Sequence, residues 1–344
     1  MATVDAPPKA APATPLSRRR RFGDRAFRWT TLVVSVGLVV MLAMLLWVLA
    51  DGGWRAIREF GVHFVIGRDW NPVTGRETYG ALPFIFGTVV TSLIAMIIAM
   101  PIGVGVALFL NESGSAWIKN PLAVLVDLLA AIPSVVYGLW GLFVLVPLFD
   151  RTVQPWMSAS IGKVPVIGSL FQYKGPGGDI FTAGVILAIM ILPIVTAVTR
   201  EVVSVVSTET REAAMALGAT RYETIRLGVL PTARPGIIGA GMLGLGRALG
   251  ETIAVALVIG NSTNITASLF NPGYTIPAVI ANEFREATSA GVHRSALLFL
   301  ALLLVLIALG MATVSRLLVR RTTRLMGGDV AAQEEAATST LGMA

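Results

Sequence analysis

Long stretches with almost no charged residue constrain the fold of this chain more than any other feature. An apolar run of about 18 or more residues can cross a lipid bilayer as a helix, which satisfies its own backbone hydrogen bonds. Barrel strands instead alternate apolar and polar residues over about 10 residues. The chain is therefore predicted to be an all-α, polytopic membrane protein with about six transmembrane helices, at 32–50, 81–110, 128–149, 180–199, 235–260 and 295–315.

The composition agrees with a membrane protein and excludes several kinds of site. Only 14% of the 344 residues are charged, against about 25% in an average soluble protein. There are no cysteines, so disulfides and cysteine-based zinc sites are excluded. The two histidines, His63 and His293, are far apart, and no metal site is predicted. The net charge of +7 is assigned to cytoplasmic loops of a membrane protein, not to nucleic-acid binding.

The distribution of Lys and Arg predicts the orientation. If the N-terminus lies inside, the cytoplasmic segments hold 17 of the 27 basic residues and the outer segments hold nine. This bias places both termini in the cytoplasm and the multi-pass chain in the plasma (inner) membrane. We divide it into a basic, largely disordered cytoplasmic N-terminus at 1–29, a transmembrane permease domain at 30–318 with a cytoplasmic loop at 201–234, and a cytoplasmic tail at 319–344. The loops at 51–80, 150–179 and 261–294 are expected outside.

A helix–turn–helix is predicted between the fourth and fifth spans, over 208–236. Gly218 can end the first helix in the left-handed conformation. Thr220 and Glu223 then form the T-x-x-E pattern of a capping box for the second helix, which Pro231 is expected to stop. Physical reasoning leaves two possibilities open, an ordinary surface hairpin or a hairpin that docks into another protein. Two apolar faces are predicted for it, one of Ala213, Ala214 and Leu217 and one of Tyr222, Ile225 and Val229.

The same segment resembles the EAA loop of ABC-importer permeases. That pattern is E-A-A, three residues, G, nine residues, I, one residue and L-P, and Gly228 replaces its isoleucine here. The resemblance implies a type I importer-like permease whose short cytoplasmic helix docks a nucleotide-binding subunit. The residues assigned to this coupling are Glu212, Ala213, Ala214, Leu217, Gly218, Leu230 and Pro231.

No phosphate-binding loop for a nucleotide is found. Gly162 and Lys163 are followed by Val164, where such a loop needs Ser or Thr. The chain is therefore expected to be no enzyme and to bind no cofactor, with ATP and Mg²⁺ used by a separate ATPase subunit.

Arg247 and Glu251 lie within the fifth span, GMLGLGRALGETIAV. At positions i and i+4 of one helix their side chains can meet, and pairing lowers the cost of placing charge in a membrane. Either the pair is a structural bridge that fixes the helix, or Arg247 faces the substrate path and binds an anion with its planar fork of donors, while Glu251 holds it when the path is empty. Six glycines in the same span are assigned mainly to close packing.

RALGETIAV, IPSVVYGLWG at 132–141 and WNPVTGRETYGALPFIFGT at 70–88 together resemble the PstC-type permeases of the bacterial phosphate-specific ABC import system. The resemblance implies a phosphate path at Arg247 and Glu251. It also implies a PstA-type second permease, two PstB-type ATPases and a PstS-type phosphate-binding protein outside. A permease for sulfate or molybdate, an ion-coupled secondary transporter or channel, and a scaffold that reports phosphate status are the alternatives.

Overall fold

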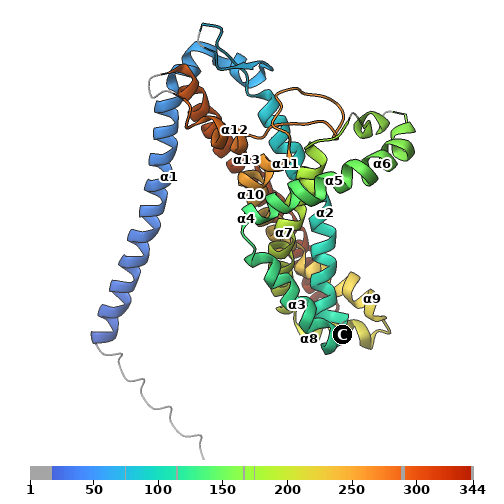
Figure 1. Ribbon diagram of the computed structural model, residues 1–344. Helices are drawn as coiled ribbons and strands as arrows, with labels where there is room; N and C mark the ends of the chain where they lie inside the picture. The colour runs from blue at the N-terminus through green and yellow to red at the C-terminus, as the bar shows by residue number, and fades with distance from the viewer. Residues whose placement is uncertain are drawn as a thin grey trace, which may run out of the picture. The chain divides into compact units, whose positions relative to one another are not determined.

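The computed structural model describes residues 18–341 except 74, 114, 166, 174 and 288–290 (Figure 1). The described chain is helical apart from loops and one pair of two-residue strands, so the all-α prediction is confirmed. It divides into two compact units, Met1–Asp51 and Gly52–Ala344.

Helix α1 (Arg18–Ile66) supplies all the described structure of the first unit and continues into the second. Its apolar side chains from Phe27 to Val48 are exposed around the helix, as expected of a segment that crosses a bilayer. Residues 1–17 of the predicted disordered N-terminus lie outside the described residues. The rest of that segment is helical, because no proline separates Arg18 from the apolar run and the helix extends back through the arginines.

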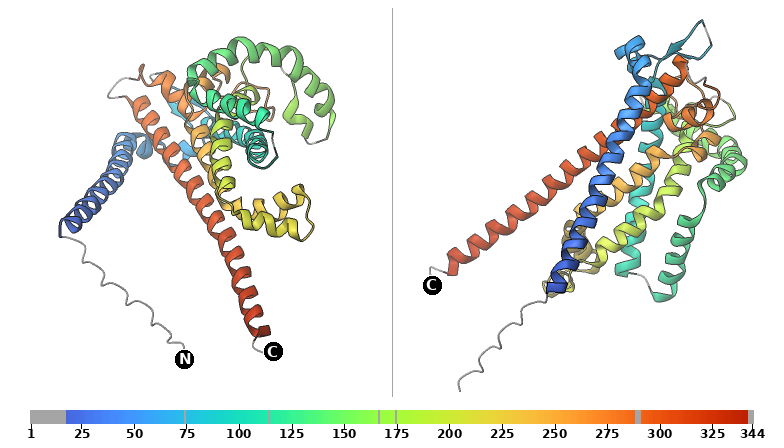
Figure 2. Two further views of the ribbon diagram at one scale, coloured as in Figure 1. Left: turned by 90° about the horizontal axis from the view of Figure 1, so that it is seen from below. Right: turned by 90° about the vertical axis from the view of Figure 1, so that its left-hand side faces the viewer.

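Three helices form the centre of the second unit: α2 (Leu82–Leu108), α7 (Ile180–Ser204) and α10 (Leu230–Gly250). Helix α2 packs along α7, and α10 packs against both (Figure 2). Helix α13 (Val292–Leu341) lies against α10 and continues through most of the predicted tail. A core of buried aliphatic side chains joins α2 and α7 to α11 (Ile253–Val258).

Five described helical segments are long and apolar enough to cross a membrane, at Gly23–Ile66, Leu82–Glu112, Ser134–Lys163, Ile180–Ser204 and Val292–Leu317. The remaining predicted span, 235–260, is divided into α10 and α11. The predicted span at 128–149 is also divided. Helix α3 (Ala116–Ala131) ends before Ile132, which has extended φ/ψ angles of −70° and 127°. Pro133 follows, and a proline disfavours the helical conformation of the residue before it.

Three π-helical segments come shortly before prolines. They are η2 (Gly141–Leu145) before Pro147, η3 (Phe149–Val153) before Pro155 and η6 (Ile225–Val229) before Pro231. Proline has no N–H for the carbonyl four residues earlier and its ring crowds that carbonyl. A π turn changes the hydrogen-bond register there, so the chain stays helical across the proline. The other helices of this stretch are α4 (Ser134–Trp140), α5 (Val146–Leu148), α6 (Gln154–Ser160) and the 3-10 turns Ile161–Lys163 and Ile167–Phe171.

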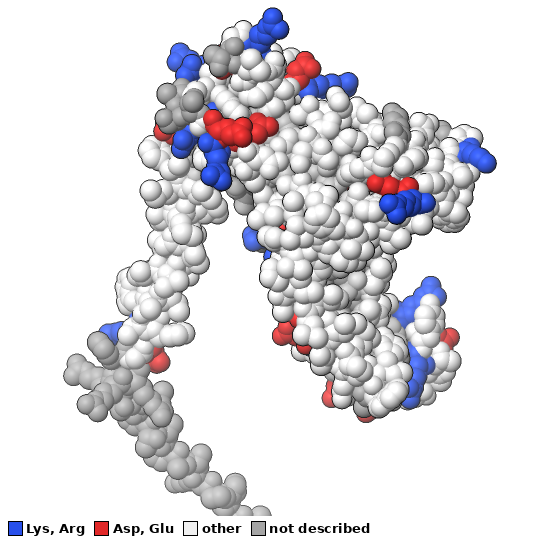
Figure 3. All heavy atoms as spheres, in the orientation of Figure 1, with Lys and Arg blue, Asp and Glu red and all other residues white. Residues whose placement is uncertain are grey.

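The two ends of the second unit carry different structures. At one end, strands β1 (Trp70–Asn71) and β2 (Thr78–Tyr79) pair antiparallel near α12 (Ile276–Glu283). At the other end, the π segment η1 (Phe109–Ser113) extends α2 and lies near the short helices α8 (Thr208–Ala216) and α9 (Arg221–Thr224). In the view of Figure 3 most charged side chains gather at these ends, and the surface between them is largely uncharged. This distribution is that of a protein whose middle lies in lipid.

Candidate functional site

The helix that carries Arg247 is interrupted directly beside the predicted pair. Helix α10 ends at Gly250, and Glu251 has extended φ/ψ angles of −70° and 130°. Thr252 is the residue before α11, which begins at Ile253. The prediction of one continuous helix through 235–260 is therefore wrong. Gly250 has low helix propensity and Thr252 is β-branched, so the sequence favours a helix least where the break occurs.

Arg247 and Glu251 still approach each other across this break. Arg247 Nη2 lies 3.9 Å from Glu251 Oε2, too far for a hydrogen bond. The Arg247 side chain is 46% exposed, whereas that of Glu251 is 9% exposed. The carboxylate is thus largely buried, and the guanidinium lies partly exposed beside it with donors available to another group.

The six glycines of α10 fall on two different surfaces. A methyl group at Gly236, Gly241 or Gly244 would collide with Val202, Met100 or Val195, so these three glycines allow α10 to approach α7 and α2 closely. The prediction that the glycines serve close packing is therefore confirmed for these three of the six.

The other three glycines lie on the side of α10 that Arg247 shares. A methyl group at Gly239, Gly246 or Gly250 would meet no atom within 4 Å, and Leu243 on the same side is 58% exposed. We call this surface, formed by Gly239, Leu243, Gly246, Arg247 and Gly250, the open face of α10. An arginine in the apolar part of a membrane helix is costly when it faces lipid, so this face is suited to a second protein chain or a water-filled path.

The hairpin between α7 and α10 has the predicted turn. Gly218 is left-handed with φ of +87°, and its N–H donates to the Met215 carbonyl at 2.9 Å. The capping box is present: the Thr220 N–H donates to Glu223 Oε2 at 2.8 Å, and the Glu223 N–H donates to Thr220 Oγ1 at 3.4 Å. The hydrogen bonds from Thr220 lower the pKa of Glu223.

Two details of the hairpin prediction are wrong. Pro231 does not stop the second helix, because it lies in the first turn of α10, where a missing N–H is tolerated, and α9, η6 and α10 form one helical path. Tyr222 and Val229 do not share a face, since Tyr222 is 68% exposed and Val229 is fully buried. The π segment changes the helical period between them.

The residues assigned to ATPase coupling lie mostly on the surface of the hairpin. Leu217 is 90% exposed, and Met215 and Tyr222 add further exposed apolar area nearby. Such exposure of large apolar side chains marks an interaction surface when they gather in one place. Of the predicted set, Glu212, Ala213, Leu217, Gly218 and Pro231 are exposed, whereas Ala214 and Leu230 are half-buried.

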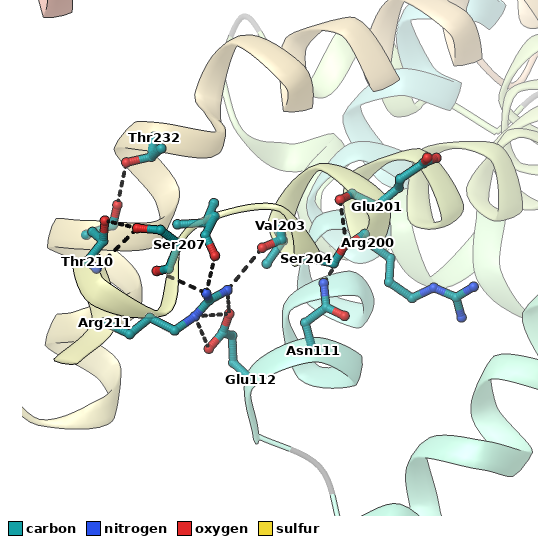
Figure 4. A network of polar contacts seen from close by, with 12 residues as sticks. Asn111, Glu112, Arg200, Glu201, Val203, Ser204, Ser207, Thr210, Arg211 and Thr232 are labelled. Atoms are coloured by element: carbon teal, nitrogen blue, oxygen red, sulfur yellow. Dashed lines mark hydrogen bonds and ion pairs between the residues drawn. The ribbon is translucent and has the colours of Figure 1, made fainter. Parts of the chain in front are cut away.

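A polar network at the base of the hairpin was not predicted (Figure 4). Arg211 of α8 donates to both carboxylate oxygens of Glu112 in η1, with Nη2 2.7 Å from Oε1 and Nε 3.3 Å from Oε2. The two residues are 99 positions apart, and no local pattern pairs them. The only sequence signal is a glutamate two residues after the predicted span at 81–110, at the end where the hairpin begins.

A second unpredicted network lies at the start of α7, on the side expected outside. Asp179 caps the helix: its Oδ1 accepts from the Thr182 N–H at 2.8 Å and its Oδ2 from Gln154 Nε2 at 2.9 Å. Asp179 and Gln154 are each 1% exposed, and Gln154 Oε1 has no partner among the described residues. Burial raises the pKa of Asp179 to about 6.

The segment 70–88 holds the same end of the second unit together. Glu283 Oε2 accepts from Trp70 Nε1 and lies 2.9 Å from His293 Nε2. Within α2, Thr88 Oγ1 accepts from the Ile276 N–H at 2.9 Å, and Gly87 approaches the Tyr274 carbonyl. His293 thus has a structural partner, and no group of three or more metal-ligating side chains occurs in the described part of the chain.

Comparison with known proteins identifies the family. A family model described as binding-protein-dependent transport system inner membrane component matches residues 99–324. The phosphate transport system permease protein PstC of Pasteurella multocida is 44% identical over 301 residues, 88% of this chain and 93% of the relative. PstC of Xylella fastidiosa is 46% identical over 294 residues, 86% of this chain and 88% of the relative.

A solved structure has the same fold. It is described as a bacterial ABC transporter involved in the import of the acidic polysaccharide alginate, and its matching chain has a TM-score of 0.56. The match covers 88% of this chain and 99% of that chain at 18% identity, which bears on the fold alone. The sequence matches decide the family: this chain is a multi-pass membrane protein of the binding-protein-dependent transport permeases and belongs, within them, to the PstC phosphate transport permeases.

Proposed function

We propose that this chain is one of two permease subunits of an ATP-driven phosphate importer. The observation that carries the proposal is the 44% identity to a PstC permease over 93% of that relative's length. A match of this extent covers both the hairpin and the broken helix. If the chain were a secondary transporter or a channel, its EAA-like segment would be a coincidence, and a match of this extent argues against that.

Phosphate passes along the open face of α10 in this proposal. The Arg247 guanidinium carries donors in a planar fork that matches two oxygens of a tetrahedral anion. Its partner Glu251 lies 3.9 Å away, so an anion replaces a loose ion pair and breaks no hydrogen bond. When the anion leaves, Glu251 attracts the guanidinium again. The pair therefore makes binding transient, as a transport path requires.

The open face is also where we place the second permease. A PstA-type partner that contributes the facing helix would shield Arg247 from lipid and enclose the path. Two PstB-type ATPases dock on the hairpins of the two permeases, here at 208–231, and a PstS-type binding protein delivers phosphate at the end that carries β1, β2 and α12. Both termini are then cytoplasmic. ATP binding opens the path outward, and hydrolysis returns it inward.

Reconstitution tests this function directly. The chain is co-expressed with the three partner types, purified as a complex and placed in proteoliposomes with the binding protein. We expect uptake of radiolabelled phosphate that requires ATP on the ATPase side, and sulfate or molybdate in excess should not compete. Competition by sulfate or molybdate would contradict the phosphate assignment. Phosphate uptake by the chain alone, driven by an ion gradient, would contradict the ABC assignment.

A further inference from the structure

Arg211 connects three helix ends at the base of the hairpin (Figure 4). From α8 it reaches Glu112 at the end of α2 through two nitrogen atoms, at 2.7 and 3.1 Å from Oε1. It also donates to the Val203 carbonyl at 3.0 Å, the Ser207 carbonyl at 3.3 Å and the Val206 carbonyl. One side chain thus holds the last turn of α7, the extension of α2 and the first turns of α8.

The surroundings make these contacts firm. The side chains of Arg211 and Glu112 are only 18% and 13% exposed, so water competes weakly for them. The carbonyls at a helix C-terminus have no partners within the helix and carry partial negative charge. A guanidinium, with five donors in a fixed plane, can serve these carbonyls and a carboxylate together, whereas a lysine ammonium cannot reproduce that geometry.

A second contact joins the same two helix ends. Asn111, beside Glu112 in η1, donates from Nδ2 to the Arg200 carbonyl of α7 at 2.6 Å. Lys119 Nζ donates to the Asn111 carbonyl at 3.2 Å and so anchors the start of α3. The end of α2 is therefore fixed to α7 independently of Arg211, and what Arg211 adds is the attachment of α8.

Helix α8 does not follow α2 in the sequence, so side-chain contacts must connect the two. Helix α8 is joined to α7 by the short segment 205–207 and continues through the Gly218 turn into α9. Within the described part of the chain, the Arg211–Glu112 ion pair joins α8 to η1, the segment that extends α2. From there, α2 and α7 pack directly against α10, with Met100 and Val195 close to Gly241 and Gly244.

We propose that the Arg211–Glu112 pair is the joint through which movement of α8 reaches α2, and through α2 and α7 the open face of α10. Arg211 is thus a positioning residue, distinct from the exposed residues of the hairpin that meet the ATPase. This inference rests on the proposed function, because it needs an ATPase that moves α8. It assigns the coupling to a side-chain contact, in addition to the continuous helical path through η6.

The test separates coupling from docking. Arg211→Lys and Glu112→Gln are each assembled into the importer complex, and phosphate uptake and ATP hydrolysis are measured in the same proteoliposomes. We expect both variants to retain the ATPase and to hydrolyse ATP at close to the wild-type rate. The phosphate transported per ATP should fall about tenfold or more, because a charge-assisted contact between moving parts is lost. Arg234→Lys and Glu201→Gln, at exposed positions near the same end, should leave the ratio unchanged.

Two results would overturn the inference. An unchanged phosphate-to-ATP ratio would show that movement reaches α10 by another route. Loss of the ATPase from the purified complex would show that the pair serves docking. Failure of the proposed function is distinguishable from both results, because the wild-type complex itself would then show no ATP-dependent uptake.

A distance measurement tests the joint without transport. The chain has no cysteines, so Gly105→Cys in α2 and Glu209→Cys in α8 place two nitroxide labels at exposed positions. We expect a narrow distance distribution between the labels in the otherwise unaltered complex. Arg211→Lys should broaden it, and a distribution of the same width would contradict the joint.

Discussion

Arg247 and Glu251 lie four positions apart, yet the helix of Arg247 ends before Glu251 and their charged groups stop 3.9 Å from each other. An uninterrupted helix would let such a pair close into a hydrogen-bonded bridge. Here the extended backbone at Glu251 holds the carboxylate back, and the guanidinium stays partly exposed on the open face. In the proposed function, this break in α10 keeps the arginine available to the anion.

Replacing Arg247 should stop transport without preventing assembly. Arg247→Gln removes the charge and the donor fork from the open face but leaves the packing glycines on the opposite side intact. We expect phosphate uptake by the reconstituted complex to fall more than about tenfold, because charge-assisted contacts to the anion are lost. Arg234→Gln, an exposed arginine near the start of the same helix, is the matched control. A complex that no longer assembles would favour the structural bridge.

Replacing Glu251 should affect binding and release in opposite ways. Glu251→Gln removes the negative charge that repels an anion at Arg247 and competes with it. We expect the apparent KM for phosphate to fall and the maximal uptake rate to fall with it, since the anion leaves the arginine more slowly. Initial uptake rates across a range of phosphate concentrations measure both. An increased KM would show that the carboxylate assists phosphate binding.

The turn at Gly218 should depend on backbone conformation and not on space. Its φ is +87°, and a methyl group there would meet no atom within 4 Å. Gly218→Asn should therefore keep the hairpin, because asparagine tolerates the left-handed region, whereas a β-branched side chain should cost more than about 1–2 kcal/mol. We expect Gly218→Val to lose the ATPase on purification and to raise amide exchange over 219–224. Equal behaviour of the two variants would contradict this account.

Local chemistry explains which parts of the hairpin could be predicted. Gly218 and the Thr220–Glu223 box act within a few residues, so the sequence alone specifies their geometry. The prediction for Pro231 is wrong because the effect of a proline depends on the hydrogen-bond register of the residues before it. The π turn at η6 shifts that register, and a proline alone does not predict a π turn, because Pro101 and Pro193 lie within α2 and α7 without one.

Tertiary contacts explain what could not be predicted at the two sites. Apolarity alone made 235–260 look like one span, and the interruption at Glu251 depends on how α11 packs against α4 and α7. The partner of Arg211 is Glu112, which only the folded arrangement of α2, α7 and α8 brings near. The overall class was predictable because the length of an apolar run is fixed by bilayer thickness, independently of packing.

Stability at the start of α7 should depend on pH through Asp179. Burial raises the pKa of this carboxyl to about 6 from an ordinary value of 3.8, so between these values the folded protein holds a proton that the unfolded chain releases. The free energy of unfolding must then fall as pH rises through this window. We expect slower amide exchange over 177–182 at about pH 4 than at about pH 8, after correction for the intrinsic rates.

The matched variant for this prediction is Asp179→Asn. Asparagine keeps a side-chain oxygen for the Thr182 N–H, so the helix cap survives, but it cannot ionise. The corrected exchange should then become independent of pH in this window. Asp179→Ala should raise exchange at every pH because it removes the cap. A pH dependence that persists in Asp179→Asn would assign the effect to another group.

Gly87 and Thr88 should hold the segment before α12 against α2. A methyl group at Gly87 would collide with the Tyr274 carbonyl oxygen, and that neighbour is backbone, so the segment must move. We expect Gly87→Ala to lower the melting temperature of the complex in detergent, whereas Gly105→Ala, where α2 has open space, should not lower it. Thr88→Val should also destabilise, by about 1–3 kcal/mol, because it leaves the buried Ile276 N–H without its acceptor. A Gly87→Ala complex as stable as Gly105→Ala would show that this contact yields without cost.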